Sequence, residues 1–150
     1  MVEHVLSLDE NLSQSFPAMN LYFPYLWFWG DLDNYIDEHV PWHWHAEPEL
    51  CYVFQGEVEY HLPEEVIVLH PGDAIFVNSN VLHMICPHNG CKDSVIIAHI
   101  FNKLLFTGYH HSSIDEKYFR PITRCRSLLY YTFHQTDPSH NAIIQLMKEC

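Results

Sequence analysis

Two histidines and a glutamate near the start of the chain's central region have a spacing that suits metal binding. His43, His45 and Glu49 share one parity, and side chains of an extended strand alternate between its faces, so all three can point to one side. Another imidazole, His83, follows further along the chain. Three imidazoles and a carboxylate suit a divalent ion such as zinc, nickel, manganese or iron. The sequence therefore predicts a metal site of His43, His45, Glu49 and His83.

The abundance of histidine limits what the first pair shows alone. The chain has 13 histidines in 150 residues, a frequency at which about one His-x-His pair arises by chance. Taken alone, His43 and His45 are more simply explained as solvated or hydrogen-bonded side chains. The joint spacing with Glu49, Gly56 and His83 carries the prediction. Glu47 has the parity of Glu49 and stays open as a competing ligand.

Short β-prone runs separated by Gly, Pro and Asn fill much of the chain. The expected strands are residues 21–29, 50–54, 58–62, 66–69, 74–77, 81–86 and 94–101. Several short strands at this spacing favour a mainly all-β fold, either a sandwich or a small barrel. The apolar run 21–29 contains Pro24 and is much shorter than the ~20 residues of a membrane span, so it is interpreted as a buried strand.

After residue 106 the pattern changes toward helices. Residues 113–119 suit a short helix with Ser113 as N-cap, ended by Pro121, and residues 127–133 suit another strand. Asp137 and the following proline predict a helix start, with an apolar side that comprises Ile143, Ile144 and Met147.

This last helix has no C-cap before Cys150. We therefore expect that the chain continues past this point, or that it forms a homodimer through the helix. The division that follows is a β-barrel domain over residues 1–136 and the start of a dimerisation or linker helix over residues 137–150.

Charge and composition exclude several classes of protein. The formal net charge is −12, with 7 basic against 19 acidic residues, so the surface repels nucleic-acid phosphates and anionic membranes. The N-terminus lacks the basic start and apolar run of a secretory signal. Five cysteines without a pairing pattern indicate reduced thiols. We expect a cytoplasmic, single-domain chain that does not contact membranes.

The metal-ligand pattern resembles the two motifs of the cupin family. The first motif is matched by His43, His45, Glu49 and Gly56, and the second by Gly72 and His83. The resemblance implies a cupin-type double-stranded β-helix, or jelly-roll barrel, followed by short C-terminal helices, with metal on the four ligand positions. The loop before His83, which contains Asn78 and Asn80, departs from the pattern of cupin enzymes.

A narrower resemblance covers most of the chain. Residues 43–56, 71–83 and 117–121 look like the N-terminal sensor domain of AraC-type transcription regulators, in which Asn-Ser-Asn before the histidine is common. The resemblance implies a domain that binds a small effector, often a sugar, and forms a homodimer through helices after the barrel. DNA would be bound only through a C-terminal helix-turn-helix domain that this sequence does not include.

Aromatic residues are dense near the predicted site and could stack on sugar rings. The residues assigned to the ligand pocket are Tyr22, Trp27, Cys51 and Tyr60. For any single aromatic residue, a core position is the more common explanation. Trp42 and Trp44 have the opposite parity to the histidines and should point outward. Residues 12–19 are a candidate movable arm.

No residue is assigned a catalytic role, because the motifs contain no second general acid or base. The alternative is a metal-dependent cupin enzyme, such as a dioxygenase, isomerase or epimerase, since the same ligands could hold a catalytic ion. A third possibility is a free-standing cupin that binds a ligand without catalysis.

Overall fold

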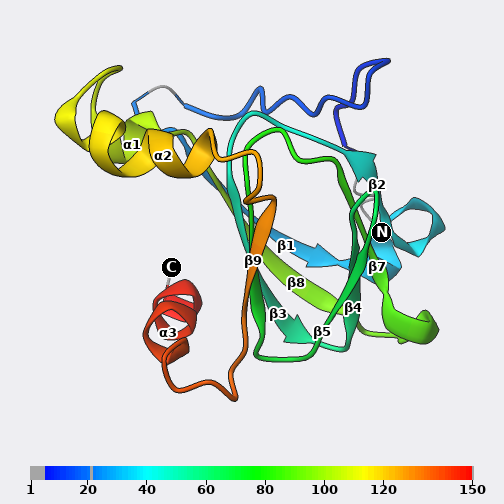
Figure 1. The fold of residues 1–150 in the computed structure, drawn as a ribbon. Helices are drawn as coiled ribbons and strands as arrows, with labels where there is room; N and C mark the ends of the chain where they lie inside the picture. The colour runs from blue at the N-terminus through cyan, green and yellow to red at the C-terminus, as the bar shows by residue number, and fades with distance from the viewer. Residues whose placement is uncertain (1–5, 21, 150) are drawn as a thin grey trace.

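Two antiparallel β-sheets face each other in the computed structural model, which describes residues 6–20 and 22–149. The five-stranded sheet has the order β1 (Tyr25–Asp31), β8 (Val95–Phe101), β3 (Glu49–Gln55), β6 (Ala74–Val77) and β9 (Tyr130–Phe133). The four-stranded sheet has the order β2 (Val40–His43), β7 (His83–Pro87), β4 (Val58–His61) and β5 (Val66–Leu69). Figure 1 shows the two sheets as the walls of a barrel. The expected mainly all-β cupin barrel is confirmed.

Short helical segments connect and follow the strands. The 3-10 helices are η1 (Leu32–Asn34), η2 (Ile36–Glu38) and η3 (His88–Gly90). After β8 come α1 (Leu104–Thr107), the π-helical turn η4 (Asp115–Phe119), α2 (Arg120–Thr123) and, after β9, α3 (Asn141–Glu149). None of the helices in the described part of the chain is long and apolar enough to cross a membrane.

The core lies between the sheets because strand side chains alternate between the two faces. On β3, Cys51 and Val53 point inward and are fully buried, whereas Tyr52 faces the other way and packs against α3. On β4, Val58 and Tyr60 are likewise fully buried. The inner faces of both sheets therefore form one apolar interior. Glu49, the first residue of β3, is a buried carboxylate within it.

The prediction that residues 21–29 form a buried strand is wrong, because side chains of the observed strand are exposed. The strand β1 starts at Tyr25 and lies at the edge of its sheet, and Leu21 is outside the described residues. Trp27 and Trp29 are 55% and 45% exposed because they point to the outer face of the sheet. The Trp29 ring contacts the ring of Phe54, with 4.9 Å between the centroids.

The helix predicted over residues 113–119 forms, but its ends differ from the prediction. The Ser112 hydroxyl, rather than that of Ser113, accepts a hydrogen bond from the Asp115 amide at 3.2 Å. Pro121 does not end the helix. The π turn passes directly into α2 through a hydrogen bond from the Arg120 amide to the Asp115 carbonyl, and Pro121 is the second residue of α2.

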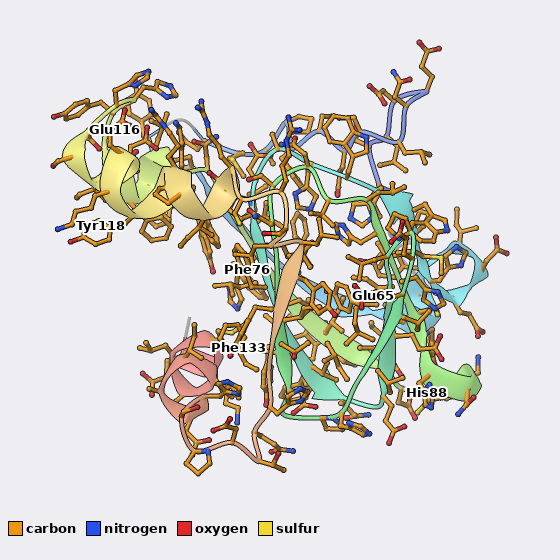
Figure 2. The ribbon with its side chains drawn as sticks, viewed as in Figure 1. Glu65, Phe76, His88, Glu116, Tyr118 and Phe133 are labelled. Carbon is orange, nitrogen blue, oxygen red and sulfur yellow. The ribbon has the colours of Figure 1, made fainter. Side chains whose placement is uncertain are left out.

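The C-terminal helix packs on the chain's own barrel. Asp137 caps a preceding turn through the Ser139 amide, so α3 begins only at Asn141. Ile144 and Met147 are 4% and 5% exposed and pack with Tyr52 on the outer face of the five-stranded sheet. Figure 1 shows α3 beside this sheet, and Figure 2 labels Phe133 between β9 and α3.

This packing corrects the prediction that the helix presents an open apolar face. The side that carries Ile144 and Met147 is closed by the barrel and is not free for a dimer contact. Leu146, on the opposite side, is 61% exposed. Substitutions at Met147 therefore report on the docking of α3 rather than on dimerisation.

The packing of α3 predicts a contrast between two neighbouring substitutions. Met147→Ala should lower the free energy of unfolding by about 2–3 kcal/mol, since it removes a buried side chain. Leu146→Ala, the matched control on the exposed side, should change it by less than about 0.5 kcal/mol. Urea denaturation followed by circular dichroism measures both. Equal losses for the two variants would contradict the docking.

Candidate metal centre

All four predicted ligands meet inside the barrel. They form a quartet that comprises His43 at the end of β2, His45 just after it, Glu49 at the start of β3 and His83 at the start of β7. Each of these residues is at most 3% exposed, and one ligand atom from each lies within 4.8 Å of the others. The structure thus brings together the residues that the sequence spacing predicted.

The strands position the quartet through their pairing. His43 of β2 stands opposite His83 of β7 in the four-stranded sheet. A bulge between Val40 and His43 adds one residue to β2. The side chains of Val40 and His43 therefore both point inward, although one position is even and the other odd. The Asn80 amide donates to the His45 carbonyl at 2.8 Å, from a left-handed turn with φ of 61°. That bond ties the loop before His83 to His45, a role that sequence reasoning did not assign.

Backbone carbonyls fix the tautomer of all three imidazoles. The Nδ1 atoms of His43, His45 and His83 lie 2.8, 2.6 and 2.9 Å from the carbonyl oxygens of Pro41, Glu47 and Val81. A carbonyl oxygen only accepts, so each Nδ1 must donate a proton. In the neutral ring the Nε2 atom then carries a lone pair. Such bonds to Nδ1 are the usual support of metal-binding histidines.

The Nε2 atoms of the histidines face the Glu49 carboxylate, an arrangement that suits a cation. Glu49 Oε2 lies 3.4 Å from His45 Nε2 and 3.8 Å from His83 Nε2, while Oε1 accepts a hydrogen bond from the Tyr60 hydroxyl at 2.9 Å. Neither of these Nε2 atoms makes a hydrogen bond within the described structure. Buried polar atoms without partners are costly. A divalent ion would satisfy all four ligands, so the donor set fits a metal.

Burial and mutual contact set the charges of the quartet. Burial and the neighbouring His83 lower the pKa of His43 to about 3, so this ring is neutral at pH 7. Burial alone would lower the pKa of His45, but contact with the Glu49 carboxylate outweighs it and raises that pKa. Burial likewise opposes ionisation of Glu49, yet contacts with His45 and His83 keep its pKa well below the usual range. Without metal, Glu49 is therefore ionised, and His45 binds a proton more readily than a free imidazole does.

A cavity of about 250 Å³ opens onto the quartet. His43 and Glu49 line its polar end, and apolar side chains of β1 and β8, such as Phe28 and Ile100, line its wall. Residues 6–7 and 14–18 cover it, and Figure 1 shows this N-terminal segment crossing one end of the barrel. The Phe16 ring meets the His45 ring edge-on, with 5.3 Å between centroids.

The residues assigned to the ligand pocket fall into two groups. Tyr60 bonds to Glu49, and Cys51 is fully buried next to them, so both belong to the interior around the quartet. Tyr22 is 97% exposed and Trp27 is 55% exposed, and neither lines the cavity. On β1 the cavity is lined by alternate positions beginning at Leu26, so Trp27 points away from it. This geometry gives no support to a pocket role for Tyr22 or Trp27.

The structure also decides between the two candidate carboxylates. Glu47 supplies its backbone carbonyl to His45, and its side chain contacts Asn102 at 3.4 Å, so it is not a ligand of the quartet. Trp44 lies outside the cavity, as its parity predicted, and its indole N–H donates to the Asn11 carbonyl.

Phe16 and Tyr35 are among the cavity residues that the sequence analysis did not assign to the pocket. Phe16 lies within the predicted arm, but its contact with His45 depends on how that arm folds back. Tyr35 lies between two 3-10 helices, where no periodic pattern indicates which way a side chain points. Burial, and then the charges of Glu49 and Cys51, raise the pKa of Tyr35 to about 12.

The quartet predicts a difference in metal content. Protein purified without chelator should carry one more equivalent of divalent metal per chain than the His45→Ala variant, because that variant loses a ligand. Glu47→Ala is the matched control and should keep the wild-type content, since its carboxylate is outside the quartet. Elemental analysis measures all three. Equal metal content in the wild type and His45→Ala would refute the site.

Metal affinity should also depend on pH in a defined direction. The pKa of His45 is raised above its ordinary value of 6.5, so below that raised pKa a proton occupies the ligand atom. Each unit of acidification below it should weaken metal binding by about tenfold, and above it the His45 contribution should be constant. Competition with a chromophoric chelator at several pH values tests this. Affinity that rises on acidification would be inconsistent with ligation by His45.

Comparisons with known proteins agree with this architecture. Residues 36–98, which contain the whole quartet, match the cupin domain family. An uncharacterized HTH-type transcriptional regulator of Bacillus subtilis (strain 168), YdeC, is 25% identical over 111 residues. That match covers 74% of this chain but only 38% of YdeC, so the chain spans well under half the length of this relative.

Similar solved structures include several from bacteria. KdgF from Halomonas sp. is 28% identical, with a TM-score of 0.39 over 42% of this chain and 57% of that one. A cupin-like protein from Thermotoga maritima is 22% identical, with a TM-score of 0.41 over 45% and 50% of the two chains. A variant of the oxalate decarboxylase OxdC from Bacillus subtilis is 19% identical, with a TM-score of 0.39 over 43% and 18%. The sequence of residues 36–98 is similar to the cupin domain family, and the two-sheet barrel with its buried quartet agrees with a cupin fold.

Proposed function

We propose that this chain is the effector-sensing part of an AraC-type transcription regulator, and that a small molecule binds in the cavity beside a metal-loaded quartet. The observation that carries the proposal is that the cavity opens directly onto His43 and Glu49. A ligand in the cavity would therefore reach the ion as well as the apolar wall. The similarity to the regulator YdeC over 111 residues supports a sensing role.

The cavity suits a small molecule with one polar and one apolar side. A divalent ion, when bound, would offer coordination positions to hydroxyl or carboxylate oxygens. The wall formed by β1 and β8 would contact the apolar face of a ring or short chain. A volume of about 250 Å³ lies just below the common range for ligand sites, about 300–1,000 Å³. A monosaccharide or a small hydroxy acid fits this description.

The N-terminal segment connects the cavity to the rest of the molecule. The Gln14 amide donates to the Trp44 carbonyl at 2.8 Å, and the Trp44 amide donates to the Leu12 carbonyl at 3.0 Å. Trp44 lies between the ligands His43 and His45, so the segment is bonded to the backbone of the metal centre. An effector that contacts this segment can favour one of its arrangements, provided that its affinity for the two arrangements differs.

The remaining parts of the regulator proposal concern the whole protein. A net charge of −12 is unfavourable for DNA contacts by this chain, which supports the proposal that a further domain, as the resemblance to AraC-type regulators implies, would bind DNA. Homodimerisation and a cytoplasmic location belong to the same proposal. Because Ile144 and Met147 are packed on the barrel, a dimer contact would have to use other surfaces, such as the side of α3 that exposes Leu146.

A metal-dependent enzyme is the second candidate, because an ion in the quartet could be reached from the cavity. Among the described residues that line the cavity, the ionisable ones are Tyr35, His43 and Glu49. Two of these are metal ligands, and the pKa of Tyr35, about 12, is too high for proton transfer near neutral pH. This lining favours binding over catalysis.

A ligand screen with two variants tests the proposal. Monosaccharides and small hydroxy acids are added to metal-loaded protein, and a fitting compound should raise the melting temperature. At 100 times its dissociation constant it adds about 2.7 kcal/mol of stability. His43→Ala should abolish the shift, because it removes both a ligand of the metal and part of the cavity. Trp27→Ala is the control and should keep it, since Trp27 faces outward.

The fate of the compound separates sensor from enzyme. If the chain is a sensor, nuclear magnetic resonance of the mixture should show the compound unchanged after long incubation. Binding of the compound should also slow the hydrogen exchange of backbone amides in residues 12–19. Consumption of the compound, with loss of that activity in His43→Ala, would favour the enzyme. A shift that persists in His43→Ala would contradict binding at the quartet.

A further inference from the structure

A second group of metal-ligating side chains lies on the outer face of the four-stranded sheet. Inward residues of β4, such as Tyr60, alternate with Glu59 and His61, which point outward. Cys86 on β7 stands directly opposite Glu59 in the antiparallel register. We call Glu59, His61 and Cys86 the outer triad. The pairing of β4 with β7 brings Cys86 next to Glu59 and His61, which lie 27 and 25 residues earlier in the chain.

The distances within the outer triad are close to those of a tetrahedral metal site. Cys86 Sγ lies 3.4 Å from His61 Nε2 and 3.8 Å from Glu59 Oε2, and His61 Nε2 lies 2.7 Å from Glu59 Oε2. Zinc bonds to sulfur, nitrogen and oxygen at tetrahedral angles place such ligand atoms about 3.4–3.6 Å apart. The separation of 3.4 Å between Cys86 Sγ and His61 Nε2 already fits, the 3.8 Å between Cys86 Sγ and Glu59 Oε2 is slightly long, and the His61–Glu59 pair must open by well under 1 Å.

A neighbouring histidine holds the Glu59 carboxylate in place. His88, in η3, lies with Nδ1 2.7 Å from Glu59 Oε1, the oxygen that the other members of the outer triad do not contact. The Asn89 side-chain amide donates to His88 Nε2 at 2.8 Å, so His88 Nδ1 carries the proton and donates to Glu59. Figure 2 labels His88 at the periphery of the barrel, beyond β7. His88 is thus a positioning residue for a carboxylate ligand.

The cluster is partly shielded yet open to solvent. The side chains of Glu59, His61 and His88 are 21%, 25% and 26% exposed. The Trp42 ring packs edge-on against His61, with 6.5 Å between centroids, and covers one side. An ion could therefore enter from solvent, while the sheet holds the ligands in register.

We propose that the outer triad is a second metal site, separate from the quartet, which binds Zn²⁺ through Cys86 Sγ, His61 Nε2 and Glu59 Oε2 and leaves a fourth position open to solvent. A thiolate, an imidazole and a carboxylate suit zinc rather than the harder calcium or magnesium ions. On binding, the Cys86 thiol loses its proton to solvent and a sulfur–zinc bond forms. His61 becomes the tautomer protonated on Nδ1, so that Nε2 can donate its lone pair.

The ion would connect the two strands that carry parts of the inner site. Tyr60, which bonds to Glu49, lies between Glu59 and His61 on β4, and β7 begins with His83. Zinc on the outer triad would hold β4 against β7 from outside the barrel. Burial and the nearby Glu59 raise the pKa of Cys86 to about 11, so the thiol is protonated at neutral pH when no cation is bound.

Cobalt substitution tests the second site separately from the first. Because the quartet contains no cysteine, a thiolate-to-cobalt charge-transfer band in the near ultraviolet reports on the outer triad. Co²⁺ is titrated into chelator-treated protein. The wild type should bind two equivalents per chain and develop the band. Cys86→Ser should lose the band and one equivalent, while His43→Ala should keep the band.

The control is Cys91→Ser, which removes a nearby thiol outside the outer triad and should keep the band. His88→Ala should weaken Zn²⁺ binding at the outer triad by about 10–100-fold, measured by competition with a chelator in the His43→Ala background. Circular dichroism confirms that each variant is folded. A folded wild type that binds cobalt without the band, or a band that survives Cys86→Ser, would overturn the proposal.

Discussion

The burial of one carboxylate among three imidazole lone pairs is the constraint on which the rest of the site depends. An ionised carboxylate inside a protein costs several kcal/mol unless charges and hydrogen bonds compensate it. Here the Tyr60 hydroxyl satisfies one Glu49 oxygen, and the other faces two Nε2 atoms that have no hydrogen bond. Backbone carbonyls hold the imidazole protons on Nδ1, so rotating the rings away would break three bonds. A divalent cation bound by all four side chains would resolve the conflict.

Because successive side chains of a strand point to opposite faces, the four-stranded sheet presents different residues to the barrel interior and to its outer face. On β4 and β7, inward residues such as Tyr60 and His83 belong to the cavity side, and outward residues such as Glu59 and Cys86 belong to the outer triad. The two clusters are thus separated by the thickness of one sheet but share its backbone. The N-terminal segment adds a third connection, because it bonds to the residue between two quartet ligands.

Local patterns predicted much of this molecule, and long-range contacts account for the rest. The strands at residues 66–69 and 74–77 match β5 and β6 at both ends, because turn residues bound them on either side. The quartet was predictable from parity, although the bulge in β2 that places His43 opposite His83 was not. Whether a face is covered depends on distant segments: Trp27 proved exposed at a sheet edge, and Met147 proved buried against β3. The outer triad was missed for the same reason, since only the register of β4 and β7 joins Cys86 to His61.

Binding of a divalent ion by the quartet can be observed by anomalous diffraction from crystals of the protein loaded with zinc. We expect a zinc peak about 2.0–2.2 Å from the Nε2 atoms of His43, His45 and His83 and from an oxygen of Glu49. A well-ordered barrel with no anomalous peak between these four side chains, at a zinc concentration that saturates the protein, would contradict it.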